Sequence, residues 1–417
     1  MMDKNENKLI GFLFVYVVLF YLSGFIVPDS IIGYQIKDEV NYHLPTIKHF
    51  AEQPSLSALR DYPSATFPLY HILYAFLYKG VTHNVHGLRF FNFLTIVFTS
   101  ILIYFYFLKT TDLNKNEIGL IVISFLSSPF LRGSGFALTT DALPYLFILL
   151  SLLVLYYGGG KKIALHVLAC FFAFCAFYTR QFYFWLPMIV FSISLVKMGR
   201  NHRLMLVLAN TVFILPAVYL AHLWGGLTPP SFQIEHQSQN VLLILPFIFA
   251  NIPFYFFPVV LYKVIQKKPF KKPDFQKSFM VLSLCLVYVL AYTHFRFNLH
   301  VIYGGFFPKV FGLLSPQLGQ PVFLIFSFCG LVILLYYLKQ NFFNNVYLVF
   351  IVGALSMSQI LFQKYVDPLL VLLVFLFYDK KSNGEFIHTK TVAIYPFMEM
   401  GLWIATLVYY GMIYPKA

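Results

Sequence analysis

The sequence has little charge of either sign and very few acidic residues. Charged residues make up 11% of its 417 positions, and Asp and Glu together number 16 against 30 Lys and Arg. Hydrophobic residues make up 59%, and apolar runs of about 17 to 25 residues recur along most of the chain. Runs of this length suit a hydrocarbon layer that is roughly 30 Å thick. The composition therefore predicts an all-α polytopic membrane protein.

Cysteine is scarce too, and its placement predicts no redox or metal centre. The sequence has four cysteines, Cys170, Cys175, Cys285 and Cys329, and all of them lie inside apolar runs. Neither a Cys-x-x-Cys spacing nor a group of neighbouring histidines accompanies them. Thiols in such surroundings are typical of small buried hydrophobic side chains.

The apolar runs predict about thirteen transmembrane helices. These are expected near 9–27, 87–109, 117–131, 141–157, 162–178, 182–197, 204–222, 242–265, 278–293, 320–338, 345–361, 366–378 and 391–412. The run at 9–27 is too long for the core of a signal peptide and lacks a small-residue cleavage site, so we expect a retained first helix.

The short apolar stretch 67–80 decides the topology. It is short and has Pro68 near its start. If it lies on the membrane surface and does not cross, most of the basic loops fall on one side of the membrane, including the loop from Lys263 to Lys277. The positive-inside rule makes that side cytoplasmic. Residues 28–86 then form an external catalytic loop with two short interfacial helices, and 223–241 form a second external loop of one integral-membrane domain over 1–417.

The predicted topology explains most of the excess of basic residues. Because it is concentrated in the short loops on one side, it would face the anionic lipids of the inner leaflet. Membrane lipid is therefore an expected partner, and nucleic acid is not.

Two adjacent carboxylates, Asp38 and Glu39, lie about ten residues after the first span. Ionisable groups near hydrocarbon are costly and usually functional. Either carboxylate could act as a general base. A helix would place Glu39 and His43 on one face, at i and i+4. Pro45 limits such a helix to a turn or two, unless it stands in the first turn of a following helix.

Other polar residues collect at the helix ends on the same predicted side. Together with the Asp38–Glu39 pair they are His43, Arg132, Asp141, Arg180, Gln181, Glu235, His236, His294, Arg296, Lys364 and Tyr365. Each by itself is also explained as an interfacial anchor or a helix cap. Asp141, for example, could cap the helix that begins after Thr139 and Thr140, or it could be a second carboxylate facing Asp38. As a group they predict a ring of carboxylates, imidazoles and cations, which suits a base and a phosphate leaving group.

Several short motifs follow one another in the order of a known family. They are Asp38–Glu39 with His43–Leu44–Pro45, Leu88–Arg89–Phe90 with Asn92, Thr140–Asp141–Ala142, Arg180–Gln181 with Trp185, and Gly225–Gly226 followed by His236. On these motifs the chain resembles the GT-C glycosyltransferases, and among them the dolichyl-phosphate-glucose alpha-1,2-glucosyltransferase family. It departs from that family in having Asp141 where Glu is usual, and in a Glu39-to-His43 spacing that is one residue longer.

The resemblance implies a GT-C-like fold and an inverting hexosyltransferase. The hexose, glucose in that family, would pass from a polyprenyl- or dolichyl-phosphate donor to a lipid-linked or surface glycan. Asp38 would be the base, with Glu39 as the alternative and Asp141 as a further catalytic carboxylate. The implied donor phosphate-binding residues are Lys364, Arg180, His43, His236 and Tyr365, and the implied substrate-binding residues are Gln181, Trp185 and Arg132.

The resemblance requires no cofactor or metal. A divalent metal held by Glu235 and His236 is the alternative, although adjacent residues make a poor ligand pair. The active site would lie on the periplasmic or lumenal side of a bacterial inner membrane or of the endoplasmic reticulum. A rival function is a lipid-linked glycan transporter or flippase. Transporters usually carry polar residues near the midplane, where Glu399 is the clearest charge of this chain.

Overall fold

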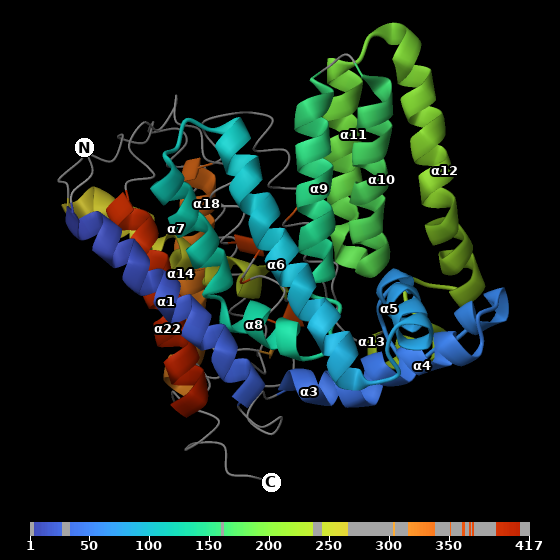
Figure 1. Cartoon of the computed structure of the whole chain (residues 1–417), viewed down its shortest axis with the longest axis horizontal. Coiled ribbons are helices and arrows are strands. Elements are labelled where there is room, and N and C mark those ends of the chain that lie inside the picture. The colour runs from blue at the N-terminus through green and yellow to red at the C-terminus, as the bar shows by residue number, and fades with distance from the viewer. Residues whose placement is uncertain are drawn as a thin grey trace. The chain divides into compact units, whose positions relative to one another are not determined.

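The computed structural model describes residues 4–26, 34–159, 162–236, 244–265, 303–304, 316–337, 351, 361–362, 367, 369–370 and 389–408. These residues are almost entirely helical, so the all-α prediction is confirmed for them (Figure 1). Their extended segments are two residues long: β1 (Tyr303–Gly304) pairs in parallel with β2 (Leu361–Phe362).

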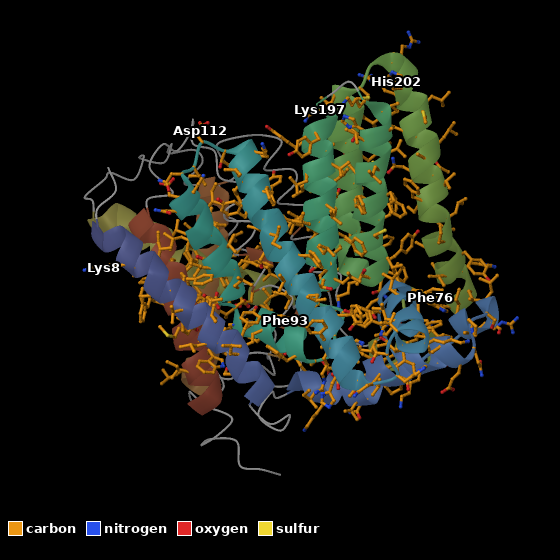
Figure 2. The ribbon with its side chains drawn as sticks, in the orientation of Figure 1. Lys8, Phe76, Phe93, Asp112, Lys197 and His202 are labelled. Atoms are coloured by element: carbon orange, nitrogen blue, oxygen red, sulfur yellow. The ribbon has the colours of Figure 1, made fainter. Side chains whose placement is uncertain are left out.

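Among the described residues, two helices are long and apolar enough to cross a membrane by themselves. They are α6 (Val85–Thr110) and the 202–224 part of α12 (Arg200–Trp224). Shorter apolar helices of 10–17 residues accompany them. Apolar side chains project from α12 along its length (Figure 2), and many of them are exposed. These features indicate a membrane protein. The number of about thirteen spans stays a prediction, since the spans expected near 278–293, 345–361 and 366–378 fall wholly or largely outside the described residues.

The span expected at 117–131 is bent in the structure. The chain forms α7 (Lys115–Leu126) and α8 (Pro129–Phe136), which meet at an angle of 66°. Pro129 explains the break, because proline has no N–H to donate and its ring collides with the carbonyl four residues earlier. The same residue is well suited to the first turn of the new helix.

The described residues belong to two compact units. The N-terminal unit comprises Gly11–Val122, Pro129–Ser238 and Tyr410–Ala417, and the C-terminal unit comprises Met1–Ile10, Ile123–Ser128 and Gln239–Tyr409. The expected first helix is α1 (Lys4–Ile26), which contributes to both. The prediction of one integral-membrane domain over 1–417 stays a prediction.

The N-terminal unit contains a group of long apolar helices. Helices α9 (Leu143–Gly158), α10 (Ile163–Thr179) and α11 (Trp185–Lys197) run side by side, with α12 next to them (Figure 1). The short 3₁₀ helix η3 (Gln181–Phe184) joins α10 to α11. Gly159 and Gly225 end α9 and α12 in the left-handed conformation, at φ values of 57° and 66°, which glycine adopts without steric cost.

The segment after α1 folds into short helices across the end of this group (Figure 1). They are α3 (Tyr34–Asp38), the π-helix η1 (Glu39–His43), α4 (Leu44–Glu52), the 3₁₀ helix η2 (Leu56–Leu59) and α5 (Leu69–Gly80). Helix α5 has 12 residues, or about 18 Å at 1.5 Å per residue, which is too short to cross a bilayer. This length agrees with a surface helix at 67–80, although the side of the membrane stays a prediction.

The predicted second external loop is packed against this segment. After α12 the chain forms α13 (Pro230–His236). The indole N–H of Trp224 donates to the Leu59 carbonyl at 2.7 Å, and the Ser231 hydroxyl donates to Asp61 at 2.8 Å. Tyr62 and Trp224 also belong to one hydrophobic cluster. These contacts fix the segment that carries the candidate site.

In the C-terminal unit, α14 (Ile244–Ile265) packs against α18 (Pro316–Tyr337) and α22 (Thr389–Val408). All three are apolar, as the expected spans 242–265, 320–338 and 391–412 require, and each contains internal proline. Residues 123–128, at the end of α7, also belong to this unit.

Candidate active site

A wide helical turn positions the two adjacent carboxylates. Helix α3 ends at Asp38, η1 follows from Glu39 to His43, and the Leu44 N–H donates to the Glu39 carbonyl five residues back. Pro45 stands in the first turn of α4, which is the alternative that lets the helix continue through it. The proline ring would collide with the Asn41 carbonyl in a regular α-helix, and the wider turn relieves that contact. Single π turns of this kind are frequent at functional sites.

Glu39 is buried and fully engaged by hydrogen bonds. Its side chain is 2% exposed, against 12% for Arg89. Oε1 accepts from Arg89 Nη2 at 2.6 Å, and Oε2 accepts from Arg89 Nε at 3.0 Å and from the Leu138 N–H at 2.6 Å. A bidentate guanidinium pair fixes orientation as well as charge. Glu39 thus joins η1 to α6 and to the chain before α9, whereas its neighbour Asp38 is partly exposed.

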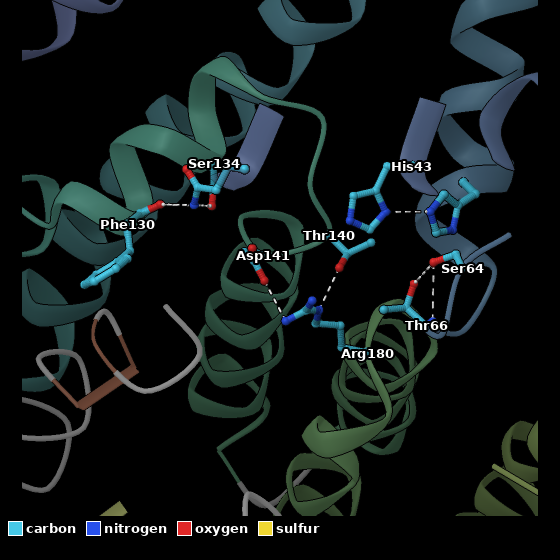
Figure 3. Close-up of polar contacts among 10 residues, drawn as sticks. His43, Ser64, Thr66, Phe130, Ser134, Thr140, Asp141 and Arg180 are labelled. Carbon is cyan, nitrogen blue, oxygen red and sulfur yellow. Dashed lines mark hydrogen bonds and ion pairs between the residues drawn. The ribbon is translucent and has the colours of Figure 1, made fainter. Parts of the chain in front are cut away.

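The second predicted carboxylate also has a guanidinium partner. Arg180 Nη1 lies 2.6 Å from Asp141 Oδ1, and both residues are 5% exposed. Arg180 Nε donates to Thr140 Oγ1 at 2.6 Å, so the guanidinium reaches both residues (Figure 3). Asp141 is not the helix cap that the sequence allowed, because Ala142 occupies the cap of α9 without a side-chain hydrogen bond. A charged partner holds the carboxylate more strongly than a backbone N–H does.

Two stacked histidines lie beside this pair. His43 Nδ1 and His71 Nε2 are 3.0 Å apart, so one ring donates to the other, and the ring centres are 5.3 Å apart. His71 is fully buried on α5. Burial, and then the proximity of His43 and Arg180, lower the pKa of His71 well below its usual 6.5. The His71 imidazole is therefore neutral at pH 7.

This pKa predicts how stability depends on pH. Below about pH 6.5 the unfolded chain binds a proton at His71, whereas the folded chain does not bind one there until the pH is much lower. Stability should therefore fall as the pH drops from 6.5 toward the lower folded pKa, by at most about 1.4 kcal/mol per pH unit. Thermal unfolding of the purified protein between about pH 8 and pH 5 measures this slope. His71→Leu should flatten it and His83→Gln, at an exposed histidine, should not; an unchanged slope in His71→Leu would exclude His71 as its source.

Arg132 lies apart from both carboxylate pairs. Its Nε donates to the Phe20 carbonyl at 2.7 Å and its Nη2 donates to Ser23 Oγ at 2.8 Å, and its guanidinium lies over the rings of Phe20 and Phe136. These contacts fasten α8 to α1. The predicted substrate-binding role of Arg132 receives no support from this position.

The remaining predicted residues have varied positions. Gln181 Nε2 donates to the Ala65 carbonyl at 2.8 Å and the Leu227 carbonyl at 3.0 Å, so it braces two loops. Trp185 is 3% exposed at the start of α11. His236 ends α13, and its side chain is outside the described positions. Lys364 and Tyr365, like His294 and Arg296, lie outside the described residues, so their roles stay predictions.

Sequence reasoning missed Arg89 and His71 as site residues. Arg89 is a cation at the start of a long apolar helix, and His71 is a polar residue on a short apolar helix; both are signals of a role near a membrane surface. Asn92, one turn after Arg89, accepts from the Tyr74 hydroxyl at 2.8 Å and donates to the Ala137 carbonyl at 2.8 Å. Gln35 donates to the Phe130 carbonyl at 3.1 Å (Figure 3). These bonds hold α3, α5, α6 and α8 around the site.

The site can supply acid–base groups and fixed positive charge. Within the described part of the chain, no group of three His, Cys, Asp or Glu side chains is placed to hold a metal ion. Comparisons of the chain with models of protein families, with curated proteins and with solved structures find no match. The function is therefore argued from the site.

Proposed function

We propose that the chain is a membrane glycosyltransferase of the GT-C kind, which transfers a hexose from a polyprenyl- or dolichyl-phosphate to a lipid-linked or surface glycan. The observation that supports this most is the contrast within the Asp38–Glu39 pair. Glu39 is held by three donors, and Asp38 beside it is partly exposed. A general base must be held in a fixed position and must reach a substrate hydroxyl. The anchored Glu39 beside it gives Asp38 the first property, and its partial exposure gives it the second.

In the proposed reaction Asp38 accepts the proton of the acceptor hydroxyl. The hydroxyl oxygen then attacks the anomeric carbon from the side opposite the lipid phosphate. The bond from that carbon to the phosphate oxygen breaks, the phosphate leaves with the electron pair, and the configuration inverts. The Glu39–Arg89 pair orients the turn that carries Asp38.

The departing phosphate needs positive charge and hydrogen-bond donors. Arg180 supplies a buried positive charge in the N-terminal unit, and Asp141 holds its guanidinium in place. The imidazole of His43, which His71 holds in place at 3.0 Å, is the proposed neighbour of Arg180 at the phosphate. Lys364, Tyr365 and His236 stay further predicted phosphate-binding residues.

The proposed topology has about thirteen spans, with the site on the periplasmic or lumenal side of a bacterial inner membrane or of the endoplasmic reticulum. It is supported by the short α5, which cannot cross a bilayer, between α1 and the membrane-length α6. It also agrees with the basic loops predicted for the opposite side.

Incubation of the purified protein with a panel of labelled polyprenyl-phosphate sugars tests the activity directly. We expect one hexose to pass to extracted lipid-linked glycans, with and without a chelator. If folded protein, supplied with the extracted acceptors, transfers none of the sugars, the proposal is contradicted.

Replacing Lys364 with Met tests the phosphate site. Because a cation that meets the donor phosphate contributes to donor binding, Lys364→Met should raise the donor KM by about tenfold or more. Lys79→Met, at an exposed lysine of α5, is the matched control and should leave the KM unchanged. A normal donor KM in Lys364→Met would remove this lysine from the site.

A lipid-linked glycan flippase is the second candidate, favoured by one observation. Glu399 of α22 is 1% exposed within an apolar helix, and buried ionisable groups in membrane helices often mark transport pathways. Vesicles that contain the protein distinguish the two functions. A flippase would move an intact lipid-linked glycan across the bilayer without breaking a glycosidic or phosphate bond.

A further inference from the structure

The C-terminal unit contains two buried carboxylates. Asp367 is 0% exposed and Glu399 is 1% exposed. The hydroxyls of Ser128 and Tyr255 both donate to Asp367. The Tyr395 hydroxyl donates to the Tyr255 carbonyl at 2.7 Å, which ties α22 to α14 beside this carboxylate.

Glu399 differs from Asp367 in its surroundings. It lies one helical turn after Tyr395 on α22 and interacts electrostatically with Asp367. In the part of the chain that the structure describes, neither carboxylate oxygen of Glu399 has a hydrogen-bond partner. Asp367 accepts two hydrogen bonds, so Glu399 is the carboxylate of the pair that lacks a hydrogen-bond donor among the described residues.

A third acceptor oxygen is available on the facing helix. Asn251 lies one turn before Tyr255 on α14 and is 0% exposed. Its Nδ2 donates to the Phe247 carbonyl at 2.7 Å, whereas its Oδ1 has no hydrogen-bond partner among the described residues. The amide therefore presents a neutral oxygen on the helix face that also carries Tyr255.

These groups are all buried oxygen acceptors, and those of Glu399 and Asn251 have no hydrogen-bond donor among the described residues. Two neighbouring carboxylates that are both ionised repel each other, and a buried charge without a partner is strongly unfavourable. A positive ion between them removes both penalties. Carboxylate and amide oxygens without imidazole or thiolate are the ligands of hard cations such as Na⁺, K⁺, Mg²⁺ and Ca²⁺.

We propose that Asp367 and Glu399 bind a hard metal cation, with the Asn251 side-chain oxygen as a neutral ligand. The cation links α14 and α22 and so stabilises the C-terminal unit. This site does not depend on the proposed transferase activity. Because its ligands come from different elements, α14 and α22 among them, binding of the ion could also be coupled to a movement of these helices within the membrane.

Thermal unfolding of the full-length protein tests the proposal. The chlorides of Na⁺, K⁺, Mg²⁺ and Ca²⁺ are titrated separately, with N-methylglucamine chloride holding the ionic strength constant. A ligand that binds only the folded state raises Tm in a concentration-dependent manner. We expect one cation to raise Tm by several degrees and in a saturable way, and Glu399→Gln to abolish that rise.

The matched control is Glu52→Gln, at an exposed carboxylate at the end of α4, which should keep the full rise. Three results would overturn the proposal: no cation-specific rise in the unmodified protein, an undiminished rise in folded Glu399→Gln, or a Tm that responds to pH but to none of the cations. The last result would make the pair a proton site.

A second measurement keeps the test decisive if Glu399→Gln does not fold. Isothermal titration of the unmodified protein with the cation chosen by the Tm series should show saturable binding. Asn251→Ala, which keeps both carboxylates, should weaken that binding by about tenfold. Absence of binding heat at every temperature tried, or unchanged affinity in folded Asn251→Ala, would exclude the proposed ligand set.

Discussion

Replacing Asp38 with Asn should lower the turnover number for hexose transfer by about 10²–10⁴-fold, the usual contribution of a general base. An amide of the same shape cannot accept the proton of the acceptor hydroxyl. The hydrogen bonds that hold Glu39 do not involve Asp38, and Asn keeps the shape of the side chain, so donor binding should stay close to that of the unmodified protein. Steady-state kinetics with the labelled donor, together with a donor-binding assay, measure both quantities.

Two controls separate this role from a general effect of charge. Glu52→Gln removes an exposed carboxylate from the same segment and should transfer hexose at the normal rate. Asp38→Glu keeps a base but shifts its oxygens, so it should retain part of the activity. Near-normal turnover in Asp38→Asn would reject Asp38 as the base and would direct attention to Glu39, the alternative.

Breaking the Glu39–Arg89 pair should have the largest effect on stability. Glu39→Gln removes the carboxylate charge that the guanidinium of Arg89 meets at 2.6 Å, and Arg89→Met removes two of the three hydrogen bonds that the buried Glu39 carboxylate accepts. Removal of one partner of a buried ion pair typically costs about 3–5 kcal/mol. Reversible unfolding in mixed detergent measures the free energy of unfolding of each variant.

The double variant distinguishes a pair from two unrelated residues. Glu39→Gln combined with Arg89→Met should cost less than the sum of the single changes, with a coupling energy of about 1–3 kcal/mol. Glu52→Gln should change stability by at most about 0.5 kcal/mol. Strictly additive single costs would show that the two side chains do not stabilise each other, and Glu39 would lose its role as the anchor of η1.

Much of the helical framework could be predicted from the sequence. The runs at 87–109, 162–178 and 182–197 correspond within a few residues to α6, α10 and α11, because a continuous apolar run in a membrane protein has only one way to satisfy its backbone hydrogen bonds. At 117–131 the hydrophobicity predicts the apolar segment but not its bend, which falls at Pro129, where the missing N–H breaks the helix.

The partners of the charged residues could not be predicted in the same way. Arg89 is 50 positions from Glu39, and Arg180 is separated from Asp141 by two helices. No local periodicity encodes such distances. Asp141 was therefore equally consistent with a helix cap until the structure placed it beside Arg180, and the contacts of Arg132 with α1 could not be read from the sequence.

The sequence by itself determined that this is a helical protein with membrane-length apolar segments, and that its few acidic residues include an adjacent pair near the first helix. Only the tertiary structure decided how the two members of that pair differ. Successive residues of a helix point in different directions, so two adjacent carboxylates meet different surroundings. Glu39 is buried against the guanidinium of Arg89 and the Leu138 N–H, and Asp38 is partly exposed.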